Sequence, residues 1–150
     1  MHIVKPQLKS LKSLLHKKNV GIITRTIVTV SQKGNGVYEY RVTEVHSVYD
    51  GDTCCLSIDL GLNVLRYKQT IRLLNVNTPE LRGVSDEEKQ KGLEARDWLR
   101  NSLDSASELI IKTHKDKTGK YGRLLGELYA DGVNLNNRML ELGLAVPYGE

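Results

Sequence analysis

Glycine-containing turn signals recur at short intervals through the first half of this sequence, and they constrain its fold more than any other feature. They stand at residues 32–36 (QKGNG), 50–53 (DGDT) and 61–63 (GLN). The intervening segments are rich in Val, Ile and Thr, which favour β-strands, and they cover residues 20–31, 37–49, 53–60 and 64–76. Short strands joined by tight turns suit a small closed barrel.

The second half of the sequence combines helix and strand signals. Residues 85–103 have helix chemistry, because Ser85 can cap a helix with an acidic first turn, although Gly92 leaves open a helix that starts only near that glycine. Strands are expected at 108–114 and 123–130, with a charged loop at 115–122 between them. A short helix at 134–142 would begin at the cap Asn134 and end at Gly143.

Composition limits the class of protein. A chain of 150 residues is expected to form one domain with its own core. Its net charge of +4 suits a polyanionic partner, nucleic acid first. The adjacent cysteines Cys54 and Cys55 are expected to be reduced thiols, one facing inward and one outward. No apolar run approaches membrane-spanning length and no secretory signal is recognised, so we expect a cytoplasmic protein with no membrane partner.

Two stretches carry candidate chemistry. In DGDT, Asp50 and Asp52 suit a hairpin turn, but Asp52 can also present a carboxylate to a hard cation. In IRLLNVNTPE, Arg72 lies in an apolar strand on the face expected for Leu74 and Val76. It either pairs with a local acid or holds a phosphate. The turn that follows places Glu80 where a carboxylate can accept a proton from water.

A third stretch, GKYGR, adds basic and aromatic groups before the strand at 123–130. Lys120 and Tyr121 offer a phosphate partner and a stacking surface, and Arg123 follows them; alternatively this is an ordinary polar loop. Together the three stretches supply a carboxylate for a cation, two arginines for a phosphate and a glutamate for water. That set fits the hydrolysis of a phosphodiester.

The order and spacing of these motifs resemble the staphylococcal nuclease (thermonuclease) family. The resemblance runs from about Tyr40 to Tyr148 and rests on DGDT, IRLLNVNTPE, GLEARDWLRNSL, KYGR and YADGVNLNNRMLELGLA. It implies an α+β, mainly β fold: a five-stranded OB-fold barrel with packed helices. It also implies a calcium-dependent endonuclease and exonuclease that hydrolyses DNA and RNA to 3′-phosphate products.

Carried over by position, the resemblance assigns a role to each candidate residue. Asp52 corresponds to the carboxylate ligand of calcium, and Thr78 to the ligand that uses its backbone carbonyl. Glu80 corresponds to the proposed general base, and Asp50 to a supporting acid near the metal. The two phosphate-binding arginines correspond to Arg72 and Arg123, and positions near the nucleotide correspond to Lys120, Tyr121 and Tyr148.

Asn77 departs from the family pattern, whose best-known members have an aspartate there as a second calcium ligand. Asparagine still offers a carbonyl oxygen to a hard cation but removes one negative charge. We therefore expect weaker calcium binding or a preference for another divalent cation. Alternatively, Asn77 marks a catalytically weakened OB-fold module that binds nucleic acid or a protein.

The domain boundaries expected from the sequence are an extension at residues 1–39 and a nuclease-like domain at 40–150 that lacks the family's C-terminal helix. In the extension, Leu8, Leu11 and Leu15 lie at helical spacing among lysines, and a strand follows at 20–31. The basic helix either packs its leucines on the domain or touches nucleic acid. It is also the only support for a third interpretation, a structural interaction domain. The sequence leaves the oligomeric state open.

Overall fold

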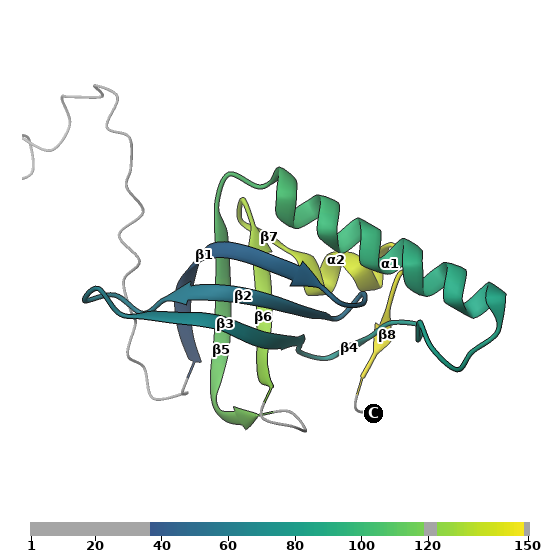
Figure 1. The fold of residues 1–150 in the computed structure, drawn as a ribbon, viewed down its shortest axis with the longest axis horizontal. Helices are drawn as coiled ribbons and strands as arrows, with labels where there is room; N and C mark the ends of the chain where they lie inside the picture. Colours follow the sequence, from purple (N-terminus) through teal and green to yellow (C-terminus); the bar gives the residue numbers. More distant parts are fainter. Residues whose placement is uncertain (1–36, 119–122, 149–150) are drawn as a thin grey trace, which may run out of the picture.

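A closed five-stranded barrel forms the centre of the molecule (Figure 1). The computed structural model describes residues 37–118 and 123–148. The expectations for residues 1–36, and for Lys120 and Tyr121, therefore lie outside the described residues. The barrel strands, in chain order, are β1 (Val37–Val48), β2 (Thr53–Asp59), β3 (Leu65–Leu73), β5 (Leu109–Thr118) and β6 (Leu124–Ala130).

The barrel closes through a short parallel pairing between its two outermost strands. The strand order is β3-β2-β1-β5-β6, and β3 then pairs with β6, with Ile71 opposite Leu124 and Leu73 opposite Gly126. Alternation along β3 buries Ile71 and Leu73 while Arg72 points the other way. The closure therefore fixes the direction of Arg72. This architecture confirms the expected mainly β, α+β fold of the OB type.

Helix α1 (Asp86–Ser105) begins at the expected cap, because the Ser85 hydroxyl accepts a hydrogen bond of 3.3 Å from the backbone N–H of Glu88. The helix runs continuously through Gly92, so the alternative start near that glycine is wrong. A Cβ at Gly92 would lie 2.7 Å from the carbonyl oxygen of Pro79. Glycine at this position lets the segment after β4 lie directly against the helix.

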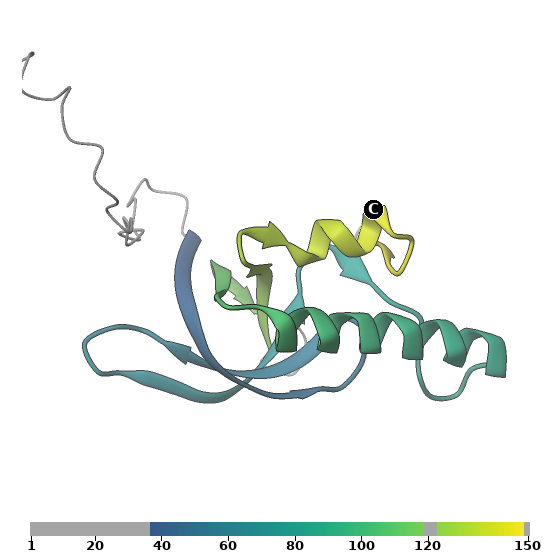
Figure 2. The ribbon, with the colours of Figure 1, turned by 90° about the horizontal axis from the view of Figure 1, so that it is seen from above.

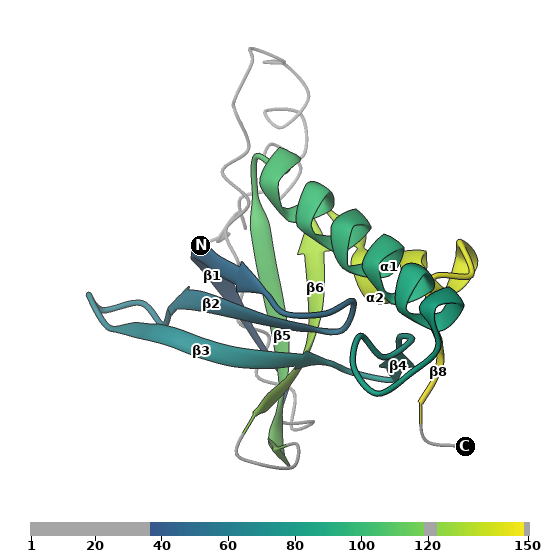
Figure 3. The same ribbon diagram turned by 45° about the vertical axis from the view of Figure 1, so that its right-hand side comes forward.

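The segment expected as one strand at residues 64–76 is divided in two. Strand β3 ends at Leu73, and Asn75 has a φ of 59°, which turns the chain before β4 (Val76–Asn77). The turn breaks the period-two alternation, so Leu74 and Val76 are buried rather than on the face of Arg72. Strand β4 pairs with β8 (Val146–Pro147), a strand that the sequence did not predict; Figure 3 shows the two side by side.

A short helix, α2 (Leu135–Glu141), is capped by Asn134 as expected, and Gly143 follows it with a φ of 69°. Strand β7 (Val133–Asn134) extends the sheet from β6. Asn136 of α2 is buried and satisfies three backbone groups, namely Leu128 N–H and the carbonyls of Leu74 and Gly126. These bonds hold α2 against the closure of the barrel.

Two features of β2 and β3 complete the fold. Cys54 and Cys55 are free and both are buried, with Cys54 inside the core cluster and Cys55 outside it, which agrees with the expected inward and outward side chains. Cys55 is covered because β2 lies between β1 and β3, with Ser47 and Thr70 as its partners in register. The hairpin between β2 and β3 extends away from the barrel, and Leu62 near its tip is 98 % exposed (Figure 2).

No helix within the described ranges has the length and apolarity to cross a membrane.

Candidate active site

A polar cavity of about 300 Å³ opens where β3 leads into β4. Five parts of the chain contribute to it: the DGDT turn, the end of β3, the segment around β4, the residue before β6 and the residue after β8. The residues that line it are Asp50, Asp52, Thr53, Arg72, Asn77, Thr78, Pro79, Glu80, Arg123 and Tyr148. All the predicted site residues except Lys120 and Tyr121, which lie in the range 119–122, therefore come together here.

Asp52 is the buried anchor of the site. One oxygen of its carboxylate accepts hydrogen bonds from the backbone N–H and the hydroxyl of Thr78, at 2.9 and 3.0 Å. The other accepts from the Thr53 hydroxyl at 3.1 Å. This approach depends on Gly51, where a Cβ would lie 2.6 Å from the methyl group of Thr78. The glycine of DGDT thus serves close packing as well as the turn.

Asp50 supports the same turn from a less favourable environment. Its carboxylate accepts a hydrogen bond of 3.1 Å from the backbone N–H of Asp52. Burial and, to a smaller extent, the nearby carboxylate of Asp52 together raise the pKa of Asp50 to about 6. Asp50 is therefore still mostly ionised at neutral pH, but its negative charge is less favourable there than in water, and a bound cation would compensate it.

Arg72 lines the cavity and contacts two of the predicted metal ligands. Its guanidinium forms an ion pair with Asp52 and donates a hydrogen bond of 3.1 Å to the side-chain oxygen of Asn77. It also lies 5.5 Å from the centre of the Tyr148 ring. The sequence left open whether Arg72 pairs with a local acid or faces a phosphate site; it does pair, and it lines the cavity while doing so.

Glu80 and Arg123 approach the cavity from opposite segments. Glu80 is exposed and follows Pro79, whose carbonyl lies against Gly92 of α1. Arg123 directly precedes β6 and is half-buried. The pairing of β3 with β6 brings Arg123 to the end of the barrel that holds Arg72. A carboxylate that can accept a proton and two cations that can face an anion therefore share one opening.

Sequence reasoning did not assign Thr53 or Pro79 to the cavity, nor the contact between Arg72 and Asn77. Thr53 follows Asp52 directly, and its hydroxyl is a signal that the sequence offered. The approach of Tyr148 depends on the pairing of β4 with β8, in which the Tyr148 N–H donates to the Asn75 carbonyl at 3.1 Å. Two-residue strands give no periodicity by which to find such a pairing.

The donor atoms at the site are oxygens, the kind of atom that a hard cation binds. Carboxylates of Asp50 and Asp52, the amide oxygen of Asn77 and the carbonyl of Thr78 are the oxygen ligands that calcium takes. Within the described ranges, no group of three or more His, Cys, Asp or Glu side chains is placed to hold a metal ion. The set fits calcium with fewer charges than an all-carboxylate site, and Arg72 occupies two of its acceptors.

The raised pKa of Asp50 predicts how stability depends on pH without metal. The folded-state pKa of about 6 exceeds the ordinary value of 3.8, so Asp50 stabilises the fold below pH 3.8, and this stabilisation disappears as the pH rises through 6. Asp50→Asn keeps an oxygen acceptor and removes the ionisation. In EDTA, its melting temperature should exceed that of the wild type by more at pH 7.5 than at pH 4.5. An equal difference at both pH values would contradict the raised pKa.

Comparison with known proteins identifies the family of the chain. The family model described as staphylococcal nuclease homologue matches residues 70–149, more than half of the chain. The chain therefore belongs to the staphylococcal nuclease family. The match spans Arg72, Glu80 and Arg123, while the DGDT turn precedes it.

Three curated relatives from Bacillus are similar to the chain. An uncharacterised protein of Bacillus anthracis is 32 % identical over 103 residues, which cover 69 % of this chain and 45 % of that protein. Endonuclease YhcR of Bacillus subtilis is 33 % identical over 69 % of this chain and 9 % of its own length. Endonuclease YncB of the same species is 32 % identical over 52 % of this chain and 37 % of its own length. The chain thus spans less than half of each relative.

Proposed function

We propose that this protein is a metal-dependent nuclease that hydrolyses phosphodiester bonds of DNA and RNA to 3′-phosphate products. The observation that carries the proposal is the shared cavity, in which Arg72, Arg123, Glu80 and Asp52 lie together. Membership in a nuclease family and the endonuclease names of two relatives support the same class of reaction.

In this mechanism the two arginines bind and neutralise the phosphate. Arg72 is oriented by Asp52 on one side and Asn77 on the other, so its planar fork is held in place before substrate arrives. Arg123, directly before β6, lines the same opening. Cations placed in advance where negative charge develops are the largest single source of rate acceleration in many such sites.

Glu80 accepts a proton from the attacking water. Its exposed carboxylate stands at the mouth of the cavity, on a segment that Pro79 and Gly92 hold against α1. A carboxylate within reach of water contributes general-base catalysis. Asp52, Asn77 and Thr78 would hold the cation, with Asp50 as a supporting acid, and the bound cation would supply a Lewis acid next to the phosphate.

Cleavage of single-stranded DNA tests the proposal. Purified protein would be incubated with labelled DNA across calcium concentrations from zero to high millimolar, with EDTA and Glu80→Gln as controls, and then with manganese and with RNA. We expect cleavage that requires the cation, leaves 3′-phosphate ends and disappears in Glu80→Gln. DNA that binds without being cut at any cation concentration would favour a binding module instead.

Asn77→Asp should strengthen calcium binding. The substitution restores a carboxylate at a position that borders the cavity and gives Arg72 a charged partner. An added carboxylate ligand raises the affinity for a hard cation, so the calcium concentration for half-maximal activity should fall about tenfold. A calcium titration of both proteins measures this change. An unchanged midpoint would place Asn77 outside the metal site.

The binding module remains the second candidate, and one observation favours it. The amide of Asn77 accepts a hydrogen bond from Arg72, so this contact forms with a neutral side chain in the place of a charged ligand. A site that only recognises phosphate needs the arginines but not Glu80. The cleavage experiment separates the two candidates.

A further inference from the structure

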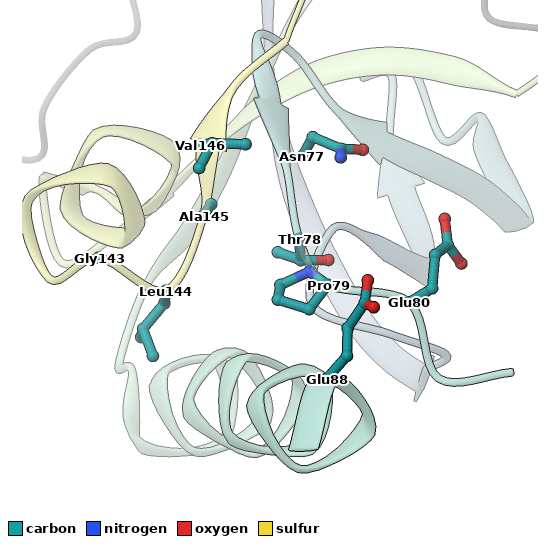
Figure 4. A pocket seen from close by; sticks show the side chains of 9 residues that line it. All are labelled: Asn77, Thr78, Pro79, Glu80, Glu88, Gly143, Leu144, Ala145 and Val146. Carbon is teal, nitrogen blue, oxygen red and sulfur yellow. The ribbon is translucent and has the colours of Figure 1, made fainter. Parts of the chain in front are cut away.

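A second cavity, of about 280 Å³, adjoins the candidate active site and has a different lining (Figure 4). It shares four consecutive residues, Asn77 to Glu80, with the first cavity. The remaining lining comes from the first turn of α1 and from the segment that leads from α2 into the first residue of β8. These residues are Glu88, Gly143, Leu144, Ala145 and Val146.

The strand pairing places this cavity beside Arg72. Asn77 and Val146 are partners in register on β4 and β8, so their side chains lie on the same face of this two-stranded sheet. Asn77 turns toward Arg72 on that face. Because the two cavities share the residues from Asn77 to Glu80, the second cavity is placed to receive a nucleotide next to a phosphate held by Arg72.

The walls of the second cavity are mostly apolar. Pro79, Leu144, Ala145 and Val146 present carbon atoms to it, and Val146 is 60 % exposed. An apolar surface of this kind favours the flat face of an aromatic ring over a phosphate or a sugar hydroxyl.

Glu88 supplies the polar group of the cavity. It is the third residue of α1, where a glutamate ordinarily reaches back to the backbone N–H of the capping residue. Within the described residues, no hydrogen bond joins the Glu88 carboxylate to Ser85; the carboxylate turns to the cavity instead (Figure 4). The Glu88 side chain is exposed, and no hydrogen bond to another described residue competes for its carboxylate oxygens, so a ligand in the cavity can donate to them.

Charge and donor pattern define the ligand. Glu80 and Glu88 together repel a second phosphate, so the cavity suits the base rather than the backbone of a nucleotide. An ionised carboxylate only accepts hydrogen bonds, and it can accept two from neighbouring donors. Guanine presents two adjacent N–H donors on its pairing edge, whereas adenine presents one amino group beside an acceptor.

We propose that the second cavity binds the base of a nucleotide next to the scissile phosphate and favours guanine through Glu88. This inference rests on the proposed function, because it names the preferred sequence of the same nucleic acid substrate. Glu88 acts on specificity, and the chemistry stays with the groups around Arg72.

A cleavage experiment tests the preference directly. Single-stranded DNA of random sequence would be cut to low conversion and the new ends sequenced. We expect guanine to be enriched about tenfold over adenine at one position flanking the cut, as for a bidentate contact with a base edge. Glu88→Gln should lose the enrichment. Glu87→Gln is the matched control, because it removes the same charge from the same helical turn but its side chain pairs with Lys91.

A binding experiment keeps the inference testable without cleavage. In EDTA, fluorescence anisotropy would compare thymidine hexamers that carry one central guanine, inosine or adenine. Wild type and Glu87→Gln should bind the guanine hexamer about tenfold more tightly than the adenine hexamer, with inosine, which lacks the 2-amino donor, weaker than guanine. Glu88→Gln should bind all three alike. Melting temperatures would confirm that each variant is folded.

The outcomes separate the inference from the proposed function. Cleavage with no guanine enrichment, or with the same enrichment in Glu88→Gln, would overturn the base site and leave the nuclease intact. A Glu88-dependent preference for guanine in binding without any cleavage would support the base site and overturn the nuclease. Equal binding of the three hexamers by the wild type would overturn the base site in either case.

Discussion

Glu80→Gln should lower the turnover number for DNA cleavage by about a hundredfold to ten-thousandfold, the usual contribution of a general base. The substitution keeps the size and the hydrogen-bonding reach of the side chain but removes the group that accepts a proton. Because Glu80 is exposed, its replacement removes no buried contact. The melting temperature should therefore change little while activity is lost.

Single-turnover cleavage at saturating calcium measures this effect, since it separates the chemical step from substrate binding and product release. Glu87→Gln is again the matched control, because that side chain lies on the surface of α1 and contacts Lys91. A Glu80→Gln protein that keeps more than a tenth of the wild-type rate would remove Glu80 from the role of base. The DNA affinity of the variant should remain close to that of the wild type.

The position of Glu80 shows what local sequence signals can predict and what they cannot. Pro79 and Gly92 were visible as a strand end and a glycine in a helical segment, and both contribute to the position of Glu80. What the sequence could not show is that they touch, because a close approach between a loop and a helix depends on tertiary packing. The same limit applies to Gly51, whose neighbours Thr78 and Ala95 are distant in sequence.

The barrel itself was predictable because its strands carry strong local signals. Turn glycines and β-branched segments set the bounds of β1 and β2 to within about a residue. The division of β3 from β4 was not predictable, since Asn75 adopts a positive φ inside an apolar run. The pairing of β4 with β8 was equally hidden, and it is this pairing that brings Tyr148 to Arg72.

The contacts of Arg72 were only half predictable. The apolar neighbours of Arg72 in the sequence indicated that its charge needs a partner. The sequence did not identify that partner, because Asp52 comes to Arg72 through the pairing of β2 with β3, where Thr53 is opposite Arg72. A residue expected to hold phosphate is therefore also part of the structural support of the site.

Arg72→Ala should consequently impair both folding stability and activity. The Arg72 and Asp52 side chains are 13 % and 8 % exposed, and removing one member of a buried pair leaves the other charge uncompensated. The expected loss is about 3 kcal/mol, which corresponds to a fall of about 6–12 °C in melting temperature for a chain of this size. Cleavage should fall by about a thousandfold or more, as for other arginines that stabilise a transferred phosphate.

Arg72→Lys and the double variant Arg72→Ala/Asp52→Asn separate the two roles. Lysine keeps a positive charge near Asp52 but lacks the planar fork that contacts Asp52 and Asn77 together, so stability should largely return while cleavage stays low. The double variant removes the uncompensated charge and should be more stable than Arg72→Ala alone. Thermal unfolding in EDTA and single-turnover cleavage measure the two effects on the same proteins. Full activity in Arg72→Lys would reduce Arg72 to a structural ion pair and leave Arg123 as the only arginine assigned to the phosphate.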